Sequence, residues 1–273
     1  MHRTIDYSKG NWYLYLRLSV INECMLMEIL GELFRRCRLI ALSGVVMMFC
    51  AQMHAQHLIG TQGLMNIPSA EMNPSGTFEG GISLLQEQMM ADKYDYYTGL
   101  YYISFTPFSF VELTFRETLR KTKKSKYDTR VGYYQQDRST SVRLRPVKEK
   151  EGKWWPSVVV GVNDIYSDHG TSEYAAVYGV LTKNFHVGSV IDISATAGYA
   201  YPIDNGMAYD GVFGGVSISP SSFNALKVMA EYDTGGVNVG ASVELFRHLR
   251  VMCLTREFKG VCAGLSYLYT IKY

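Results

Sequence analysis

The sequence predicts an all-β fold, an antiparallel up-and-down transmembrane β-barrel of about 10–12 strands. Segments with alternating apolar and polar residues recur between residues 76 and 269, and a period of two is typical of strands whose two faces meet different environments. Aromatic residues cluster at segment ends, as in residues 94–97 and 154–155, where a membrane barrel carries its aromatic girdles. Charged residues make up only 19% of the chain, below the roughly 25% of a soluble domain. These features favour a closed sheet in a membrane.

The first 55 residues are predicted to precede the barrel domain. Residues 35–38 hold three arginines, residues 39–51 are mainly apolar, and the small residue Ala55 ends the stretch, which is the order of a cleavable secretory signal peptide. The apolar run is shorter than the roughly 20 residues that a membrane-spanning helix needs. We therefore expect a mis-called upstream extension at 1–26, a signal peptide at 27–55 and the barrel domain at 56–273.

Each predicted strand alternates in polarity and is bounded by turn residues. Residues 226–233 show the pattern most clearly, because Leu226 and Val228 share one face while Lys227 and Glu231 share the other. Turn-forming residues such as those at 204–206 and 234–236 separate the strands. The predicted strands are residues 76–85, 96–105, 110–119, 141–145, 157–165, 175–182, 190–201, 211–219, 226–233, 237–245, 249–255 and 260–269.

The short turns imply a meander, which must either close into a barrel or fold into a sandwich. The end of the chain favours the barrel, because Gly264, Tyr267, Tyr269 and Tyr273 resemble the terminal-strand signal that outer-membrane assembly machinery reads. A periplasmic β-sandwich binding protein is the alternative. The barrel reading, together with the signal peptide, predicts the cell outer membrane as the location.

Several segments resemble the YjbH family of Gram-negative outer-membrane proteins associated with exopolysaccharide or capsule export. They are Thr61 to Ala70 (TQGLMNIPSA), Ser157 to Ile165, Met229 to Asp233 and Val237 to Gly240. The resemblance spans most of residues 56–273 and matches a short, single-barrel form. It implies a β-barrel that takes part in exopolysaccharide or capsule biosynthesis or export. The partners it implies are outer-membrane lipid, the assembly machinery, polysaccharide and periplasmic export proteins.

Charged and polar residues on the predicted strands are candidates for the lumen and for substrate binding. Arg143 and Arg145 share one strand face, and the planar arginine fork suits the carboxylates of acidic sugars. The alternative is a lumen filled by mutually paired charges, with these arginines against Glu231, Asp233 or Asp164, and we favour it because small barrels fill their interiors with side chains. The lumen candidates are Arg143, Arg145, Asn163, Asp164, Glu231 and Asp233.

Two further features concern the connections between strands. The basic run from Arg120 to Lys126 is predicted to be a solvated loop, because it is too charged to cross lipid. Cys253 and Cys262 are the cysteines that follow the signal peptide. They fall opposite one another, and could form a disulfide, if residues 256–259 make the hairpin turn; a turn staggered by one residue would separate them.

No catalytic grouping stands out. The histidines at 57, 169, 186 and 248 show no metal-ligand spacing, so we expect no enzyme, no metal and no cofactor. A net charge of only +2 provides no field to recruit nucleic acid. The predicted function is that of a non-catalytic outer-membrane barrel in exopolysaccharide or capsule biosynthesis, and the alternative is a structural or interaction barrel that anchors a periplasmic envelope complex.

Overall fold

The computed structural model describes residues 58–87, 97–125, 127–167, 173–203, 206 and 208–271. The predicted upstream extension, the predicted signal peptide and Tyr273 lie outside these residues. No helix in the described ranges has the length and apolar character to cross a bilayer. The strands are β1 (Thr77–Leu85), β2 (Thr98–Phe108), β3 (Val111–Lys123), β4 (Val131–Val147), β5 (Ser157–Ser167), β6 (Ala176–Val187), β7 (Ile191–Pro202), β8 (Gly211–Pro220), β9 (Leu226–Tyr232), β10 (Val237–Leu245), β11 (Leu249–Arg256) and β12 (Gly260–Thr270).

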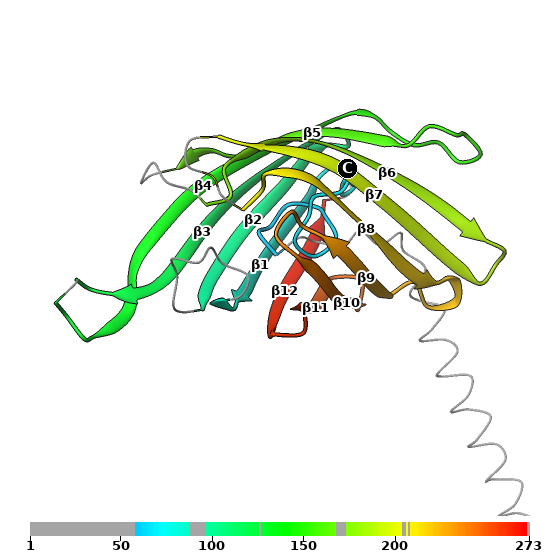
Figure 1. Cartoon of the computed structure of the whole chain (residues 1–273). Coiled ribbons are helices and arrows are strands. Elements are labelled where there is room, and N and C mark those ends of the chain that lie inside the picture. Colours follow the sequence, from blue (N-terminus) through cyan, green and yellow to red (C-terminus); the bar gives the residue numbers. More distant parts are fainter. Residues whose placement is uncertain are drawn as a thin grey trace, which may run out of the picture. The chain divides into compact units, whose positions relative to one another are not determined.

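The twelve strands form one closed barrel in which each strand pairs antiparallel with its neighbours in the chain (Figure 1). β1 closes the barrel, because it pairs with β2 on one side and with β12 on the other, where Thr77 lies opposite Thr270. The predicted up-and-down barrel of about 10–12 strands is therefore confirmed. The β-sandwich alternative is wrong, because a sandwich needs two packed sheets and this sheet closes on itself.

Closure divides every strand into an inner and an outer face. In β2, Leu100, Tyr102 and Ser104 point inward and are buried, whereas Tyr101 and Ile103 point outward with 41% and 52% of their surface exposed. The inner wall carries charged side chains that solvent does not reach, and the outer wall carries apolar ones that are exposed. This distribution is the reverse of that in a soluble protein.

β3 extends into the basic run that the sequence predicts to be a loop. Arg120 to Lys123 belong to β3, and Arg120 is buried inside the barrel. The prediction was wrong for these residues, because charge is costly at lipid-facing positions but every second residue of a barrel strand faces the lumen. The connection begins at Lys124. Within it Arg130 Nη2 lies 2.8 Å from Asp128 Oδ2, and this hydrogen-bonded partner lowers the pKa of Asp128 below its ordinary value.

The hairpin between β11 and β12 separates the two cysteines. Arg256 lies opposite Gly260, so the turn comprises only residues 257–259 and the register places Cys262 opposite Leu254. Cys253 therefore points outward and is exposed, Cys262 points inward and is buried, and both thiols are free. The disulfide that a turn at residues 256–259 would allow does not form, because the turn is one residue shorter than the pairing requires.

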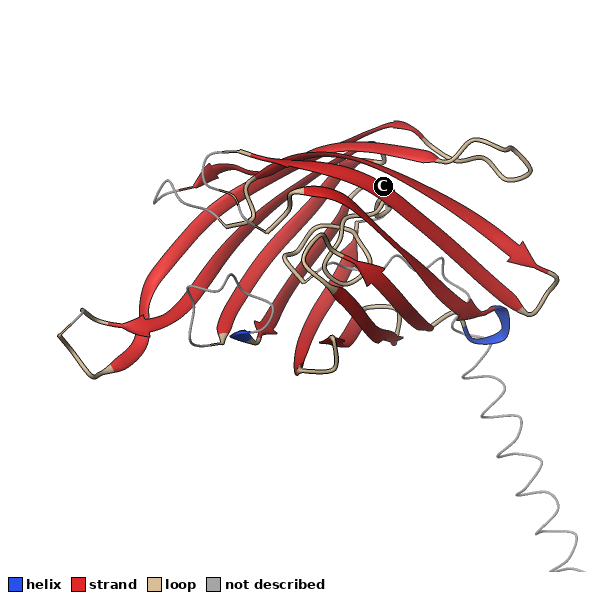
Figure 2. Ribbon diagram, viewed as in Figure 1, coloured by secondary structure: helices blue, strands red, loops and turns tan. Residues whose placement is uncertain are grey.

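Residues 58–73, which we call the plug segment, lie inside the barrel ahead of β1. The plug segment has no regular strand or helix and runs as a compact loop among the strands (Figure 2). It is held together by backbone hydrogen bonds from Leu58 to Met65 and from Leu64 to Ile67, each 2.9 Å long. Leu58, Ile59, Met65 and Ile67 are wholly buried. The lumen is thus filled by the segment of the chain that directly precedes β1.

Candidate functional site

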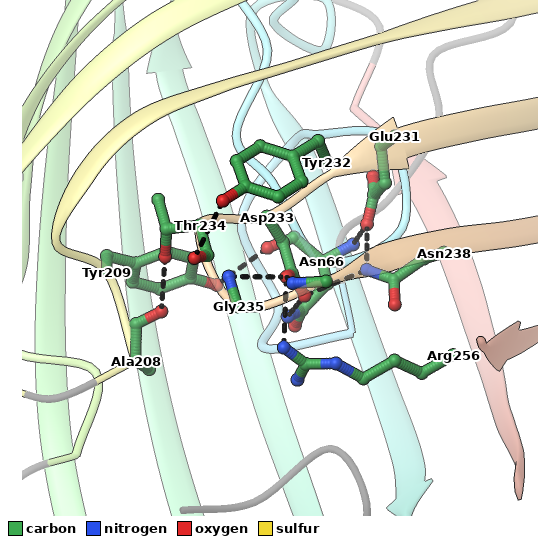
Figure 3. Close-up of polar contacts among 11 residues, drawn as sticks. Asn66, Ala208, Tyr209, Glu231, Tyr232, Asp233, Thr234, Gly235, Asn238 and Arg256 are labelled. Carbon is green, nitrogen blue, oxygen red and sulfur yellow. Dashed lines mark hydrogen bonds and ion pairs between the residues drawn. The ribbon is translucent and has the colours of Figure 1, made fainter. Parts of the chain in front are cut away.

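Glu231 in β9 links the barrel wall to the plug segment. Its carboxylate oxygens accept the backbone N–H groups of Met65 (3.0 Å) and Asn66 (2.6 Å), and Oε1 also accepts from Asn238 Nδ2 at 2.9 Å (Figure 3). On the opposite side Tyr209 Oη donates to the Asn66 carbonyl at 2.9 Å. A buried loop must find partners for its backbone, and a carboxylate is a strong acceptor for N–H. Glu231 therefore binds the plug segment, where the sequence suggested a substrate-binding residue.

Asp233, at the end of the same inward face, holds the side chain of Asn66. Its Oδ2 accepts from Asn66 Nδ2 at 2.6 Å and from Asn238 Nδ2 at 2.8 Å (Figure 3). Its Oδ1 accepts from Arg256 at 3.3 Å and from the Gly236 N–H at 3.0 Å, which fastens the β9–β10 hairpin. One carboxylate therefore joins the plug, two neighbouring strands and a turn.

Arg143 and Glu112 form a second link, from β4 and β3. Arg143 Nη1 lies 3.0 Å from Glu112 Oε1, and neither side chain is accessible to solvent. Glu112 Oε1 also accepts the Gln62 N–H at 3.0 Å, while Arg143 Nη2 donates to the carbonyls of Ser69 and Glu71. The pair therefore binds the plug segment from both sides, and Arg143 is not available to guide a sugar.

This pairing supports the charge-filled lumen but corrects its partners. The sequence suggested Glu231, Asp233 or Asp164 for the arginines, whereas Glu112 lies directly opposite Arg143 in the β3–β4 register. Directly opposed residues on neighbouring strands are the nearest available partners. The error arose because the register of β3 against β4 was not known.

Asn163 and Asp164 are consecutive in β5, yet both are buried. The β4–β5 pairing shifts at this point, and Asp164 adopts a left-handed φ of 53°. Such a β-bulge turns two successive side chains towards one face. Asp164 forms a buried ion pair with Arg116 of β3. Both predicted residues therefore belong to the lumen wall. They face the same way because of a bulge, which alternation alone does not predict.

Glu79 of β1 is a central lumen residue that the sequence analysis missed. Its Oε1 lies 3.1 Å from Arg250 Nη1, and its Oε2 accepts from Gln62 Nε2 and Asn73 Nδ2, both at 3.0 Å. Arg250 also lies 3.2 Å from Glu244. Glu79 lies on the inward face of a correctly predicted strand, so the alternation test applied to Glu231 would have found it.

A cavity of about 470 Å³ lies at the end of the barrel where β4 ends and β5 begins. Residues 71–74 of the chain, the β4–β5 connection, residues 183–186 and residues 192–194 contribute to its lining. Arg145, the remaining lumen candidate, also lines it, but its guanidinium donates to the Ser109 carbonyl and only 7% of the residue is exposed. The predicted lumen candidates are therefore divided between the plugged centre and this mouth cavity.

The predicted assembly signal lies on both faces of β12. Tyr267 and Tyr269 point outward and are more than half exposed. Gly264 points inward, where a Cβ atom would lie 3.2 Å from Ser83 Oγ and 3.3 Å from Leu58 Cδ2. The tyrosines therefore contribute to the outer surface, whereas Gly264 leaves room for the first residue of the plug segment.

The sequence of the plug segment and of the first seven strands matches a known protein family. The family profile described as "Exopolysaccharide biosynthesis protein YbjH", the YjbH family, matches residues 55–208. The chain belongs to the YjbH family. The match includes the plug segment and β1 to β7, so the resemblance predicted from the sequence is confirmed.

Some wall residues that bind the plug segment lie within the residues matched by the YjbH profile, and others lie beyond them. Glu79, Glu112, Arg143 and Thr182, whose Oγ1 accepts the Ala70 N–H at 2.8 Å, lie within the matched residues. Glu231 and Asp233 lie beyond them. In the described part of this YjbH-family chain, no group of His, Cys, Asp and Glu side chains is placed to hold a metal ion.

No curated protein matches the chain in sequence. Among solved structures, the chain is similar to one described as "KdgM porin", with a TM-score of 0.46 and 11% identity, over 71% of this chain and 99% of that one. It is also similar to Wzi of Escherichia coli, described as an outer-membrane, carbohydrate-binding β-barrel involved in group 1 capsule assembly. There the TM-score is 0.32 and the identity 10%, over 72% of this chain and 56% of that one.

Proposed function

We propose that this chain is a plugged outer-membrane barrel that takes part in exopolysaccharide or capsule biosynthesis as a non-catalytic interaction barrel, and that the polymer does not pass through its lumen. Membership of the YjbH family supports the exopolysaccharide context. The plug segment supports a barrel that does not conduct, because a lumen filled by bound backbone has no continuous path for a glycan.

The outer surface supports insertion in a membrane. Ile82, Ile103, Val212 and Leu265 point away from the lumen and each exposes more than 40% of its surface. Exposed apolar side chains that surround a closed barrel are stable in lipid and costly in water. Since bilayers accept sheets only when every edge is paired, the closed pairing of β1 with β12 suits the same environment.

The lengths of the connections support one orientation. At one end the strands are joined through residues 109–110, 148–156, 188–190, 221–225 and 246–248, and all but the second of these connections have two to five residues. At the other end the connections are residues 86–97, 124–130, 168–175, 203–210, 233–236 and 257–259, and the first four have seven to twelve residues. Membrane barrels have short periplasmic turns and longer extracellular loops. The end with mostly shorter connections, which holds the mouth cavity, is therefore assigned to the periplasm.

The observation that carries the proposal is the attachment of the plug backbone to three wall side chains, Glu112, Thr182 and Glu231. Its test is a locked plug. The double variant Ala70→Cys with Thr182→Cys is designed to join two neighbouring positions of plug and wall by a disulfide, since the backbone nitrogen of Ala70 lies 2.8 Å from Thr182 Oγ1. Expressed in a strain that lacks this gene, the locked barrel is expected to restore polymer production as well as the native chain.

A locked barrel that restores production only under reducing conditions would show that the plug must leave, and would overturn the proposal. Either single-cysteine variant is the matched control.

Fractionation and heat-dependent gel mobility in detergent test the barrel itself. The protein is expected in the outer-membrane fraction, and its folded form is expected to migrate differently from the boiled form. In the mature protein, N-terminal sequencing is expected to begin at Gln56.

A further inference from the structure

We infer that the mouth cavity binds a neutral, hydroxyl-rich oligosaccharide segment. The inference deepens the proposed function, on which it rests, by naming the class of ligand that the barrel holds at its periplasmic end. At about 470 Å³ the cavity lies within the roughly 300–1,000 Å³ of small-molecule sites. Its floor includes residues 71 and 72 of the plug segment, so a ligand enters from the mouth and stops there.

The lining suits a partner that both donates and accepts hydrogen bonds. Ser194, Ser217 and Ser219 offer hydroxyl groups, which donate and accept. The amide N–H₂ groups of Asn73 and Asn184 are bonded within the wall, so these side chains add their carbonyls as acceptors. Few apolar side chains line the cavity, Met72 and Ile193 among them. Sugar hydroxyls also act as both donor and acceptor, whereas an apolar ligand would offer the serine hydroxyls no partner.

The charges of the lining balance one another. Arg145, Lys148, Lys183 and Lys227 contribute four positive charges, and four carboxylates, those of Glu71, Glu149, Glu151 and Asp192, oppose them. Lys183 Nζ lies 2.5 Å from Glu149 Oε1, and His186 Nδ1 lies 2.6 Å from Asp192 Oδ1. A lining with so little excess charge does not concentrate a polyanion. The cavity therefore favours a neutral glycan over the acidic one that exposed arginines would have suited.

The wall of the cavity is fixed before any ligand arrives. Glu149 Oε2 accepts both the backbone N–H and the side-chain amide of Asn184, each at 3.0 Å, and the N–H of Glu149 donates to Ser157 Oγ at 2.9 Å. Asn184 Nδ2 also donates to Glu71 Oε1 at 2.9 Å. The β4–β5 connection, β6 and the plug are thus joined around the cavity, which reduces the ordering cost of binding.

The same connection carries an aromatic pair at the rim. Trp154 is 85% exposed, and its ring centroid lies 6.4 Å from that of Trp155. Lys183 Nζ donates to the Lys153 carbonyl at 2.6 Å, which fixes the connection directly before these rings. Indole rings offer flat apolar faces against which the C–H face of a sugar can pack. The pair therefore supplies an outer contact and a fluorescence reporter for a bound glycan.

The test is calorimetric titration of the full chain in detergent with four neutral hexasaccharides: maltohexaose, cellohexaose, laminarihexaose and mannohexaose. At least one is expected to bind, with a shift of tryptophan fluorescence and with a Kd that changes by less than about twofold between low and high salt. Ser194→Trp, which fills the cavity, is expected to weaken binding by about tenfold or more. Ser189→Trp, on the exposed β6–β7 turn of the same end, is the matched control and is expected to bind as the native chain does.

Two results would overturn the inference: no binding of any neutral hexasaccharide, whether or not hexagalacturonate binds, or equal binding by Ser194→Trp. Ser219→Trp fills the same cavity from β8 and serves if Ser194→Trp lacks the folded, heat-modifiable form. The locked-plug test does not depend on this titration. A cavity that fails to bind, in a locked barrel that restores polymer production, would refute the glycan site and leave the plugged barrel standing.

Discussion

The centre of the lumen and its mouth are built from the same kinds of polar residue and serve different ends. At the centre, Glu112, Arg143 and Glu231 are buried and bound to the plug segment or to one another. At the mouth, Asn184 and Ser194 line an open cavity. Charge in the interior of a barrel is therefore no evidence of a conduit by itself, because a filled lumen also needs it. In the described part of the lumen, the mouth cavity provides the room for a ligand.

The largest loss of stability is expected when Arg143 is removed from the centre of the lumen. Arg143→Ala leaves Glu112 buried without its ion pair and removes two hydrogen bonds to plug carbonyls. Removal of one partner of a buried pair costs about 3–5 kcal/mol, and a loss of that size is expected in urea unfolding of the folded barrel in detergent. Arg138→Ala on the same strand is the control, because Arg138 lies 3.7 Å from Glu117 with a largely exposed side chain and is expected to cost about 0–1 kcal/mol. Equal losses would mean that Arg143 is not a central link.

The next largest effect is expected when the plug loses its acceptor in β9. Glu231→Ala removes the carboxylate that accepts the Met65 and Asn66 N–H groups. Hydrogen bonds to a charged acceptor are stronger than those between neutral groups, so the plug is expected to loosen. In planar bilayers the native chain is expected to give no steady conductance and Glu231→Ala to give intermittent openings. Glu257→Ala, in the exposed β11–β12 turn, should remain closed. Steady conductance of the native chain would refute the plug.

The contrast also shows what a sequence reveals about such a protein. Alternation is local, so the order of the strands and the inward faces of Arg143, Glu231 and Asp233 could be predicted from neighbouring residues. The prediction of residues 141–145 as a strand was too short, because β4 runs from Val131 to Val147. The plug segment could not, because residues 61–70 contain no periodic pattern and owe their place to contacts such as Asn66 with Glu231, 165 residues apart in sequence. Family resemblance singled out this segment without indicating where it lies.

The register between neighbouring strands was the second feature that could not be predicted from the sequence. Whether Arg143 faces Glu112, or Cys253 faces Cys262, depends on the position of a turn to within one residue. The β11–β12 turn comprises residues 257–259, where the disulfide needed one residue more. The bulge that turns both Asn163 and Asp164 inward is a larger departure, because β5 advances four residues there while β4 advances two. Such offsets are set by packing across the sheet and leave little trace in the sequence.

A smaller effect is expected where the centre meets the mouth, at Asn184. Asn184→Ala removes the amide that joins Glu71 to Glu149 and leaves the backbone bond from residue 184 to Glu149 in place. The loss of two partly buried hydrogen bonds should cost about 1–2 kcal/mol in urea unfolding, with no conductance in bilayers. Neutral-hexasaccharide binding should weaken severalfold. Conductance in this variant would show that the plug is held from the mouth, and would erase the distinction between the two regions.

The smallest effect uses a native thiol to report on the centre. Cys262 points into the filled lumen, where its Sγ accepts the Gln86 N–H at 3.3 Å, whereas Cys253 points outward. In a Cys253→Ser background, a charged methanethiosulfonate reagent is expected to leave Cys262 almost unmodified in the folded barrel, because only 1% of the residue's surface is exposed. The reaction should become faster when Glu231→Ala loosens the plug. The reagent itself is expected to leave folding and stability unchanged. Rapid modification in the native background would mean that water reaches the inner wall past the plug, so that the lumen is closed to polymer but not sealed.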